Sequence, residues 1–398
     1  MSYFVNVPKP ADLNIIHGQA PMLYWRLSGF YFFYFASLGA LIPYWGLYLK
    51  TLGFGIVQIG ELVAIIMATK IVAPNIWGWI ADHSGQRMRM VRLACLLATL
   101  AFAGVFFWKG YWWLALIMSV FSFFWNAALP QFEATTLSHL GDQTQRYSSI
   151  RLWGSIGFIV LVTVLGLLFD RFGNQWLPVV LVVLFALIWL SSLLVPENAS
   201  GHLSLEHTPL RKVLSRPVVL SLLAVCFLIQ MSHGPYYTFY SLYMTNYGYS
   251  ETAIGQLWAL GVVAEIAVFL RMHIWLPHYG ARKLLLVAAS LTVVRWCLLA
   301  WRPDLLWLMI VSQSLHAASF GLYHAVAIHL IHELFHGRNQ GKGQALYSSL
   351  SFGAGGALGS LSAGYLWVGA GPQQMYLAAA AVAVVAVIIT WRGVKGID

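Results

Sequence analysis

Long apolar runs follow one another along the whole chain, and short polar breaks separate them. A helix needs about 20 mainly apolar residues to cross the hydrocarbon core of a bilayer, and these runs have roughly that length. The pattern therefore predicts twelve membrane-spanning helices in two sets of six. The predicted ranges are 23–50, 57–80, 90–109, 112–138, 147–169 and 176–195, then 217–246, 252–276, 284–300, 305–334, 343–368 and 374–391.

One longer polar stretch interrupts this pattern near the middle of the chain. Residues 196–216 include Glu197, Arg211 and Arg216 and contain no apolar run. We read this stretch as a linker on the cytoplasmic side of the membrane. The sequence thus predicts an N-terminal six-helix bundle over 1–195, the linker over 196–216, and a C-terminal six-helix bundle over 217–398.

Composition narrows the class of protein further. Of the 398 residues, 60% are hydrophobic and 9% are charged, whereas soluble domains have about 45–50% apolar and about 25% charged residues. So few charged side chains cannot cover the surface of a soluble fold. This excludes a soluble enzyme, a disordered regulator and a secreted disulfide scaffold. We expect an all-α, multi-pass membrane protein that carries no cofactor or metal.

The basic residues predict the orientation in the membrane. The chain has 23 Lys and Arg, 13 Asp and Glu, and a net charge of +10. With the N-terminus and the linker in the cytoplasm, most of the basic residues lie at cytoplasmic helix ends, as the positive-inside rule requires. We therefore expect both termini to be cytoplasmic in a cell (inner) membrane, and the excess charge to reflect topology and lipid headgroups rather than nucleic acid. The basic residues at the opposite ends are Lys50, Lys109, Arg171 and Arg302, and those within spans are Lys70, Arg151, Arg271 and Arg295.

The two halves resemble each other at an offset of 195 residues. Gly53 aligns with Gly248, and Gly85 aligns with Gly280. The matches run in order through the first two helices of each half, which indicates duplication. Because each half has an even number of helices, both copies insert the same way up. Parallel repeats of this kind hold a substrate at their interface and open to each side by rocking.

The loop after the second predicted helix carries a recognisable motif. From Gly78 to Arg89 it reads GWIADHSGQRMR, which resembles the signature G-x-x-x-D-[RK]-x-G-[RK]-[RK] of the major facilitator superfamily. His83 and Gln86 stand where that signature has basic residues. The resemblance implies the major facilitator fold, with a gating loop formed by Gly78, Asp82, Gly85 and Arg87.

Longer strings resemble a narrower family. The strings beginning at Arg151 (RLWGS), Leu257 (LWALGVVAE), Val294 (VRW) and Leu315 (LH) are similar to those of the phenylpropionate permease family. The members of that family are proton-coupled relatives of the lactose permease. The resemblance implies a twelve-helix, proton-driven importer, but it does not determine the substrate.

A few charged and polar residues fall inside the predicted spans. A charge at the bilayer centre costs about 2.5–3.5 kcal/mol on insertion scales, so such residues are candidates for function. Lys70 and Glu265 are equivalent under the offset of 195, which suggests two sides of one cavity. The alternative for each pair of charges is a buried ion pair that only fixes helix packing. The candidates are Lys70, Glu133 and Arg151 in the first half, and Glu265, Arg295, His233, His316 and His324 in the second.

The resemblance to the lactose permease implies roles for some of these residues. Glu265, Arg295 and His316 look like its proton-coupling set of acid, arginine and histidine. No second carboxylate follows His316 within three residues. This leaves Glu265, or alternatively Glu133, as the proton carrier.

An organic anion in the cavity would need a cation. Arg151 is the first candidate because a guanidinium can hold a carboxylate through two hydrogen bonds, and Arg295 and Lys70 are the next. Aromatic side chains would form the wall, although aromatic residues also gather at membrane interfaces. The predicted substrate-binding residues are Arg151, Glu133, Lys70, Tyr34, Trp45, Tyr236, Tyr240, His233 and His324.

One motif points to a different class of protein. His332, Glu333 and His336 match H-E-x-x-H, which on one helix face binds zinc in metalloproteases. This remains a remote alternative, because the motif lies at the end of a span in a repeated transporter-like chain. We expect a monomeric, non-enzymatic importer of a small aromatic organic acid with a proton. A proton-coupled sugar or nucleoside symporter and a multidrug exporter are the alternatives.

Overall fold

The computed structural model describes residues 10–141, 143, 146–197, 210–336 and 339–395, with side chains from residue 22 onward. All regular structure in these ranges is helical. The first six spans consist of α1 (Pro10–Thr51), α2 (Ile56–Ser84), α3 (Arg87–Ala103) with η1 (Gly104–Phe106), α4 (Tyr111–Leu140), α5 (Tyr147–Phe172), and η3 (Asn174–Trp176) with α6 (Leu177–Leu193).

The second half follows the same plan, and two of its spans contain a π-helical segment. A short helix, α7 (Leu210–Leu214), precedes its first span. The spans are α8 (Pro217–Asn246), α9 (Glu251–Tyr279), α10 (Ala281–Trp301), then α11 (Leu306–Ser314) with η4 (Ala317–Leu322) and α12 (Tyr323–Leu334), then α13 (Asn339–Ser348) with η5 (Ser349–Gly355) and α14 (Gly356–Ala370), and finally α15 (Pro372–Gly393).

The predicted number of spans is confirmed. Among the described residues, eleven helices are long and apolar enough to cross a membrane. The twelfth is the continuous helix of α13, η5 and α14 over Asn339–Ala370. The observed bounds differ from the predicted ones by a few residues, because apolar runs define the part of a helix inside the bilayer and not its polar ends.

The structure corrects two details of this prediction. Helix α2 continues to Ser84, so Gly78 and Asp82 lie within the helix and the turn itself is limited to Gly85 and Gln86. In addition, η4 and η5 are π-helical segments inside the tenth and eleventh spans. Segments of this kind often occur at functional sites, and apolar periodicity does not reveal them.

The offset of 195 residues also relates the observed helices. The span Met22–Thr51 in α1 matches α8, and α2 matches α9, at both bounds. The turns agree as well: Gly53 and Gly248 have φ of 89° and 81°, and Gly85 and Gly280 have φ of 65° and 77°. Only glycine adopts these angles without strain. The second helix of each half therefore lies between two glycines with positive φ.

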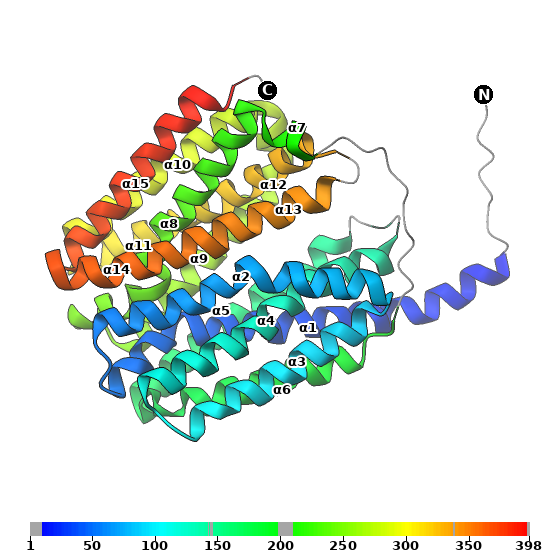
Figure 1. Cartoon of the computed structure of the whole chain (residues 1–398), viewed down its shortest axis with the longest axis horizontal. Coiled ribbons are helices and arrows are strands. Elements are labelled where there is room, and N and C mark those ends of the chain that lie inside the picture. Colours follow the sequence, from blue (N-terminus) through cyan, green and yellow to red (C-terminus); the bar gives the residue numbers. More distant parts are fainter. Residues whose placement is uncertain (1–9, 142, 144–145, 198–209, 337–338, 396–398) are drawn as a thin grey trace.

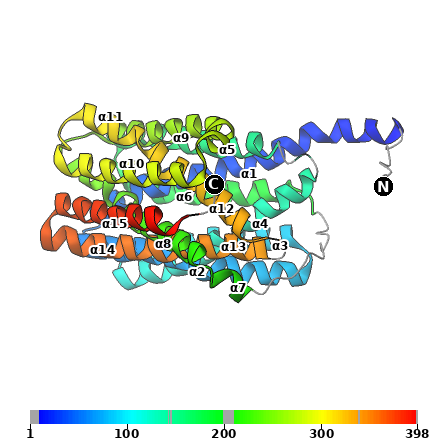
Figure 2. The same ribbon diagram turned by 90° about the horizontal axis from the view of Figure 1, so that it is seen from above.

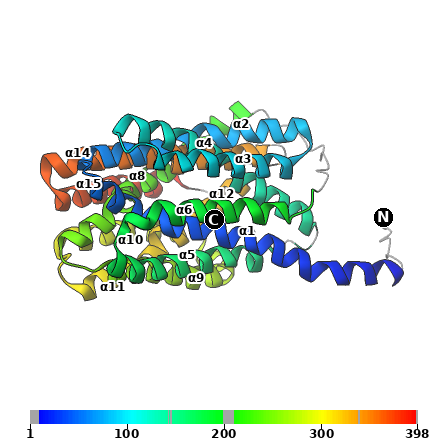
Figure 3. The same ribbon diagram turned by 90° about the horizontal axis from the view of Figure 1, so that it is seen from below.

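The helices form two groups that meet along one interface (Figure 1). Helices α1 to α6 make up one group and α8 to α15 the other. Across the interface α2 packs against α14, α5 against α9, and α1 against α8. Figures 2 and 3 show the same arrangement from above and from below, with the long α1 extending beyond the bundle. Within the predicted linker, residues 198–209 lie outside the described residues.

Two carboxylates of the first group hold the second group at one end of the interface, which we call the sealed end. Glu61 of α2 accepts hydrogen bonds from the hydroxyl of Tyr111 at 2.6 Å and from that of Tyr365 at 3.1 Å. Asp170 of α5 accepts from the backbone N–H groups of Glu251 and Thr252 at 2.7 and 2.9 Å. Asp170 thereby caps the first turn of α9, where a negative charge is favoured.

Glycines allow the helix backbones to approach closely near the sealed end. A Cβ on Gly255 of α9 would lie 2.5 Å from the carbonyl oxygen of Val162 in α5. A Cβ on Gly60 of α2 would lie 2.9 Å from the carbonyl oxygen of Ser360 in α14. Any side chain at these positions would push the two groups apart.

Candidate functional site

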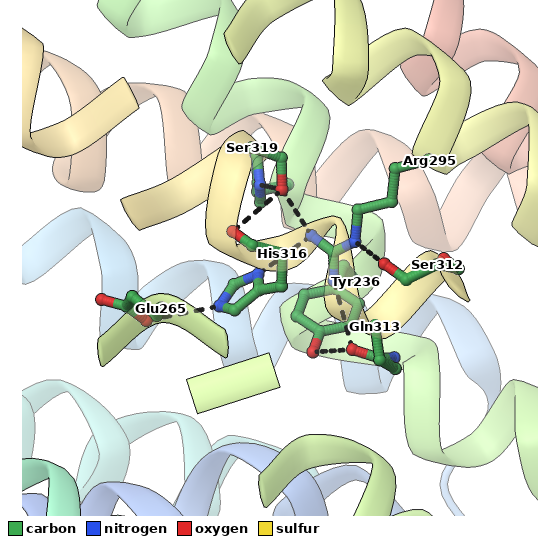
Figure 4. A network of polar contacts seen from close by, with 8 residues as sticks. Tyr236, Glu265, Arg295, Ser312, Gln313, His316 and Ser319 are labelled. Atoms are coloured by element: carbon green, nitrogen blue, oxygen red, sulfur yellow. Dashed lines mark hydrogen bonds and ion pairs between the residues drawn. The ribbon is translucent and has the colours of Figure 1, made fainter. Parts of the chain in front are cut away.

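A buried arginine in the middle of α10 organises the polar side chains of the second group (Figure 4). Arg295 is fully buried. Its Nε donates to the carbonyl oxygen of Ser312 at 3.1 Å, and its Nη1 donates to Ser319 Oγ at 2.9 Å. Its guanidinium also lies 4.1 Å from the centre of the Tyr236 ring. We call Arg295 and its hydrogen-bonding partners the Arg295 network.

The same arginine determines the tautomer of His316. Nη1 of Arg295 lies 3.0 Å from Nδ1 of His316. A guanidinium only donates hydrogen bonds, so Nδ1 must accept and the neutral ring carries its proton on Nε2. Nε2 in turn lies 3.9 Å from a carboxylate oxygen of Glu265 in α9. Glu265 therefore faces an N–H donor across a gap slightly longer than a hydrogen bond.

His233 also belongs to the Arg295 network. Its Nδ1 lies 2.8 Å from the carbonyl oxygen of Ile229, so this nitrogen donates. Its Nε2 then accepts from Ser319 Oγ at 3.3 Å. His233 is fully buried. The structure thus places this predicted substrate residue inside the network.

Arg151 of α5 lies on the other side of the interface. Its guanidinium is 3.6 Å from the centre of the Phe35 ring. It interacts electrostatically with Glu133 of its own half and with Glu265 and His324 of the other half. The ion pairs in the described part of the chain do not include Glu133 with Arg151. Arg151 thus has several ionisable groups around it and is not held by a single ion-pair partner.

Lys70 of α2 lines a cavity between the two groups. The cavity is partly open, and the empty space in and around it, open solvent included, is about 410 Å³. Of the predicted substrate-binding residues, Trp45 and Lys70 lie in its wall, which also includes Tyr237 from the predicted aromatic cluster of the span α8. The lining consists of Leu38, Leu41, Ile42, Trp45, Gly46, Val63, Ile66, Met67, Lys70, Trp125, Tyr237 and Thr238.

Three other predicted substrate residues lie away from this lining. Tyr34 stacks on Trp125 and donates to its carbonyl oxygen at 3.3 Å. Tyr240 is buried against Trp258. His324 is 2.8 Å from the hydroxyl of Tyr347 through Nδ1. A polar or aromatic residue on an apolar helix is a candidate for function. The sequence does not show which face of the helix this residue occupies.

The predicted gating loop contains an ion pair between the second and third helices. Asp82, in the last turn of α2, forms an ion pair with Arg87 in the first turn of α3. The N–H of Gly85 donates to the carbonyl oxygen of Ala81 and ends α2 in the left-handed conformation. Gly78 faces α4, where a Cβ would lie 3.2 Å from Gln131 Nε2.

The H-E-x-x-H motif does not form one helix face. Helix α12 ends at Leu334, so His336 lies beyond the helix that carries His332. Glu333 forms an ion pair with His329 at 3.3 Å. No group of three or more potential metal-ligating side chains was found among the described residues. The helical geometry that zinc proteases use is therefore lacking at this motif.

Twelve spanning helices around a central polar interface define a membrane transporter of the major facilitator type. The chain belongs to the MFS_1 like family, whose profile matches residues 24–378. This membership confirms the predicted superfamily and fold.

Individual relatives agree with this assignment. A protein of Escherichia coli (strain K12), named as a probable 3-phenylpropionic acid transporter, is 32% identical over 354 residues, which cover 86% of this chain and 90% of that protein. The maltose permease of Geobacillus stearothermophilus is 28% identical over 350 residues, which cover 85% and 86%. The first relative confirms the predicted likeness to the phenylpropionate permease family.

Solved structures show the same fold. A crystal structure of a mutant of the nucleoside transporter NupG superimposes with a TM-score of 0.83 at 16% sequence identity, and covers 94% of this chain and 100% of that one. The relatives and the structural neighbours are transporters. The protein is therefore a multi-pass membrane transporter and not an enzyme, which overturns the protease alternative.

Proposed function

We propose that the protein imports a small aromatic organic acid together with a proton by alternating access. The observation that carries the proton coupling is the position of Glu265. This carboxylate lies within a membrane span, its side chain is 14% exposed, and it faces His316. Among the described residues it forms no ion pair with an arginine or a lysine. A carboxylate in such surroundings can gain and lose a proton as its environment changes.

The Arg295 network supports Glu265 as the proton carrier. The Nε2–H of His316 faces Glu265 at 3.9 Å and favours the ionised carboxylate electrostatically. For His316 to become an imidazolium, its Nδ1 would have to release the hydrogen bond from Arg295 at 3.0 Å. We therefore assign His316 and Arg295 as positioning residues. The proton itself resides on Glu265, while Glu133, the second candidate, lies near Arg151 in the other half.

Movement of the two halves would change the charge around Glu265. Arg151 belongs to α5 and Glu265 to α9, and the two side chains interact electrostatically across the interface. Rocking that separates α5 from α9 would weaken this attraction. Weaker attraction favours the protonated carboxyl. This links proton binding and release to the conformational cycle.

The proposed substrate class rests on the relative from Escherichia coli and on the cation in the cavity. That relative is named for 3-phenylpropionic acid. A carboxylate needs a cation, and Lys70 lines a cavity whose wall includes Trp45, Trp125 and Tyr237. A sugar or a nucleoside would leave the charge of Lys70 unbalanced. The same argument speaks against a multidrug exporter of cationic compounds.

We further propose the orientation and the organisation of the chain. The distribution of Lys and Arg supports an inner-membrane protein with both termini in the cytoplasm, which would make the sealed end the outer one. We propose a monomer with bundles over 1–195 and 217–398, joined by the linker 196–216, and the two groups of helices support this division into bundles.

Uptake into proteoliposomes tests this function. Purified protein is reconstituted, an inward proton gradient is imposed, and uptake of labelled 3-phenylpropionate, maltose and uridine is followed. We expect the gradient to accelerate uptake of the aromatic acid alone. If the gradient accelerates uptake of maltose or uridine instead, the substrate assignment is wrong. If it accelerates none of the three, proton symport is wrong.

A further inference from the structure

The cavity around Lys70 is rich in hydrogen-bond donors. No Asp or Glu is among its lining residues, and its one charged side chain is Lys70. Lysine ammonium and indole N–H groups only donate hydrogen bonds. The side-chain oxygen acceptors in the wall are the hydroxyls of Tyr237 and Thr238, and Thr238 Oγ1 itself donates to Ser360 Oγ at 2.9 Å.

Lys70 has no partner within the part of the chain that the structure describes. It forms neither a hydrogen bond nor an ion pair there. An ammonium group within a membrane span is costly, and such groups normally pair with an acid or a carbonyl. Lys70 is partly exposed in the cavity, so an anion that enters from outside the protein can reach it.

Two indole groups strengthen this argument independently. Trp45 and Trp125 are 2% and 3% exposed, and both line the cavity. Their Nε1 atoms are buried without any hydrogen-bond acceptor in the described residues. Buried N–H groups in proteins almost always have a hydrogen-bond acceptor. Two indole N–H groups without an acceptor, in the same wall as an ammonium group without a partner, therefore need an explanation. One anionic ligand that accepts from all three groups provides it.

The two arginines of the candidate site, Arg295 and Arg151, are poorer candidates than Lys70 for binding this anion. Arg295 already donates to Ser312, His316 and Ser319 within the second half. Arg151 also lacks an ion pair among the described residues, but its guanidinium covers the Phe35 ring at 3.6 Å and it is not among the cavity lining. Arg295 would have to give up its hydrogen bonds to bind an incoming carboxylate, whereas Lys70 lines the cavity and has no such bonds to lose.

We propose that Lys70, Trp45 and Trp125 form the binding site for the carboxylate of the transported acid. The hydrocarbon part of the acid packs against the apolar side chains in the same wall, including Leu41, Val63 and Met67. This inference rests on the proposed function and adds to it the subsite for the anionic group. The substrate anion is thus bound by the first half, and the proton by Glu265 in the second.

Two neighbouring tyrosines connect the carboxylate site to the Arg295 network. Tyr237 lines the cavity, and its ring stacks on His233 with centroids 5.8 Å apart. Tyr236 covers the guanidinium of Arg295 and donates to Gln313 Oε1 at 2.9 Å. A ligand that displaces Tyr237 would therefore also move Tyr236, the next residue of α8, and with it the Arg295 network.

Equilibrium binding to the purified, detergent-solubilised protein tests the carboxylate site. The probes are 3-phenylpropionate and its uncharged amide, 3-phenylpropanamide. In Lys70→Met we expect the affinity for the acid to fall at least tenfold while the affinity for the amide changes less than twofold. Trp45→Phe and Trp125→Phe remove one N–H each and should weaken acid binding about threefold to tenfold. Arg271→Met, which removes a basic residue of the membrane span of α9 outside the cavity, is the matched control.

The outcomes separate this inference from the proposed function. Equal loss of the acid and the amide in Lys70→Met would overturn the carboxylate site, as would unchanged binding of the acid. A variant that elutes as a single symmetric peak and still binds the amide has folded. If the wild type prefers hexanoate to 3-phenylpropionate and Lys70→Met abolishes that binding, the carboxylate site stands and the aromatic substrate class is wrong.

Discussion

Arg295 places Nη1 at 3.0 Å from Nδ1 of His316, and this contact fixes the imidazole with its proton on the side of Glu265. The arginine is fully buried and is held by the carbonyl oxygen of Ser312 and the hydroxyl of Ser319. The ring therefore has little freedom to change its tautomer. In the proposed mechanism, Glu265 binds and releases a proton next to a histidine that keeps its own.

Replacing Glu265 by Gln should separate transport from the proton. Glutamine has nearly the same shape but cannot ionise, so the variant should lose the acceleration of uptake by an inward proton gradient. Exchange of external for internal substrate should persist, because it needs no proton movement. Both are measured in proteoliposomes. Glu333→Gln, an acid paired with His329 at a helix end, should behave like the wild type. Loss of coupling in both variants would contradict the role of Glu265.

The seal between the halves should depend on Tyr365 more than on Tyr111. Both hydroxyls donate to Glu61, but Tyr365 belongs to the opposite half and Tyr111 to the same one. Tyr365→Phe removes a hydrogen bond between the halves, so it should shift the balance of conformations toward opening at this end. Tyr111→Phe removes one within the first half and should shift the balance little.

Distances between spin labels measure this shift. Labels at Lys109→Cys and Asp304→Cys, in exposed turns of the two halves, report the separation of the sealed end by double electron–electron resonance. Cys297 is exposed and must first be replaced by serine. An equal effect of both phenylalanine variants would mean that Glu61 acts on stability within its own half and not on the seal.

Alanine at Gly255 should disturb the packing of the halves, whereas alanine at Gly29 should not. The Cβ at position 255 would overlap the carbonyl oxygen of Val162, but nothing lies within 4 Å of a Cβ at position 29. Overpacking costs about 1–3 kcal/mol, while alanine in an open helical position gains up to about 1 kcal/mol. Thermal unfolding in detergent should show a lower Tm for Gly255→Ala and an equal or higher Tm for Gly29→Ala.

Zinc should have no role in transport. His336 lies past the end of α12 and cannot share a helix face with His332. We expect purified protein to contain well under one zinc per chain by plasma emission spectrometry, and His332→Ala to retain uptake within twofold of the wild type. Stoichiometric zinc together with loss of uptake in this variant would restore a functional role for the motif.

The sequence predicted the helices well because apolar length is a property of each segment alone. It also singled out Lys70, Glu265 and Arg295, because charges are rare within spans. It did not reveal the bond between Tyr365 and Glu61, which are 304 residues apart in the chain. Nor did it reveal Trp125 as part of the cavity wall. Both depend on which helix faces meet across the interface, and an apolar helix in a membrane has no strongly amphipathic pattern to show its inner face.

The opposite charges at the repeat-equivalent positions Lys70 and Glu265 have an electrical consequence. With the proposed acid on Lys70 and a proton on Glu265, the two positions together carry no net charge. With both ligands gone, the ammonium and the carboxylate again sum to zero. Membrane voltage acts only on moved charge, at about 2.3 kcal/mol per charge and 100 mV. Transport would then be independent of the membrane potential. The substrate could be concentrated at most about tenfold for each unit of pH difference across the membrane.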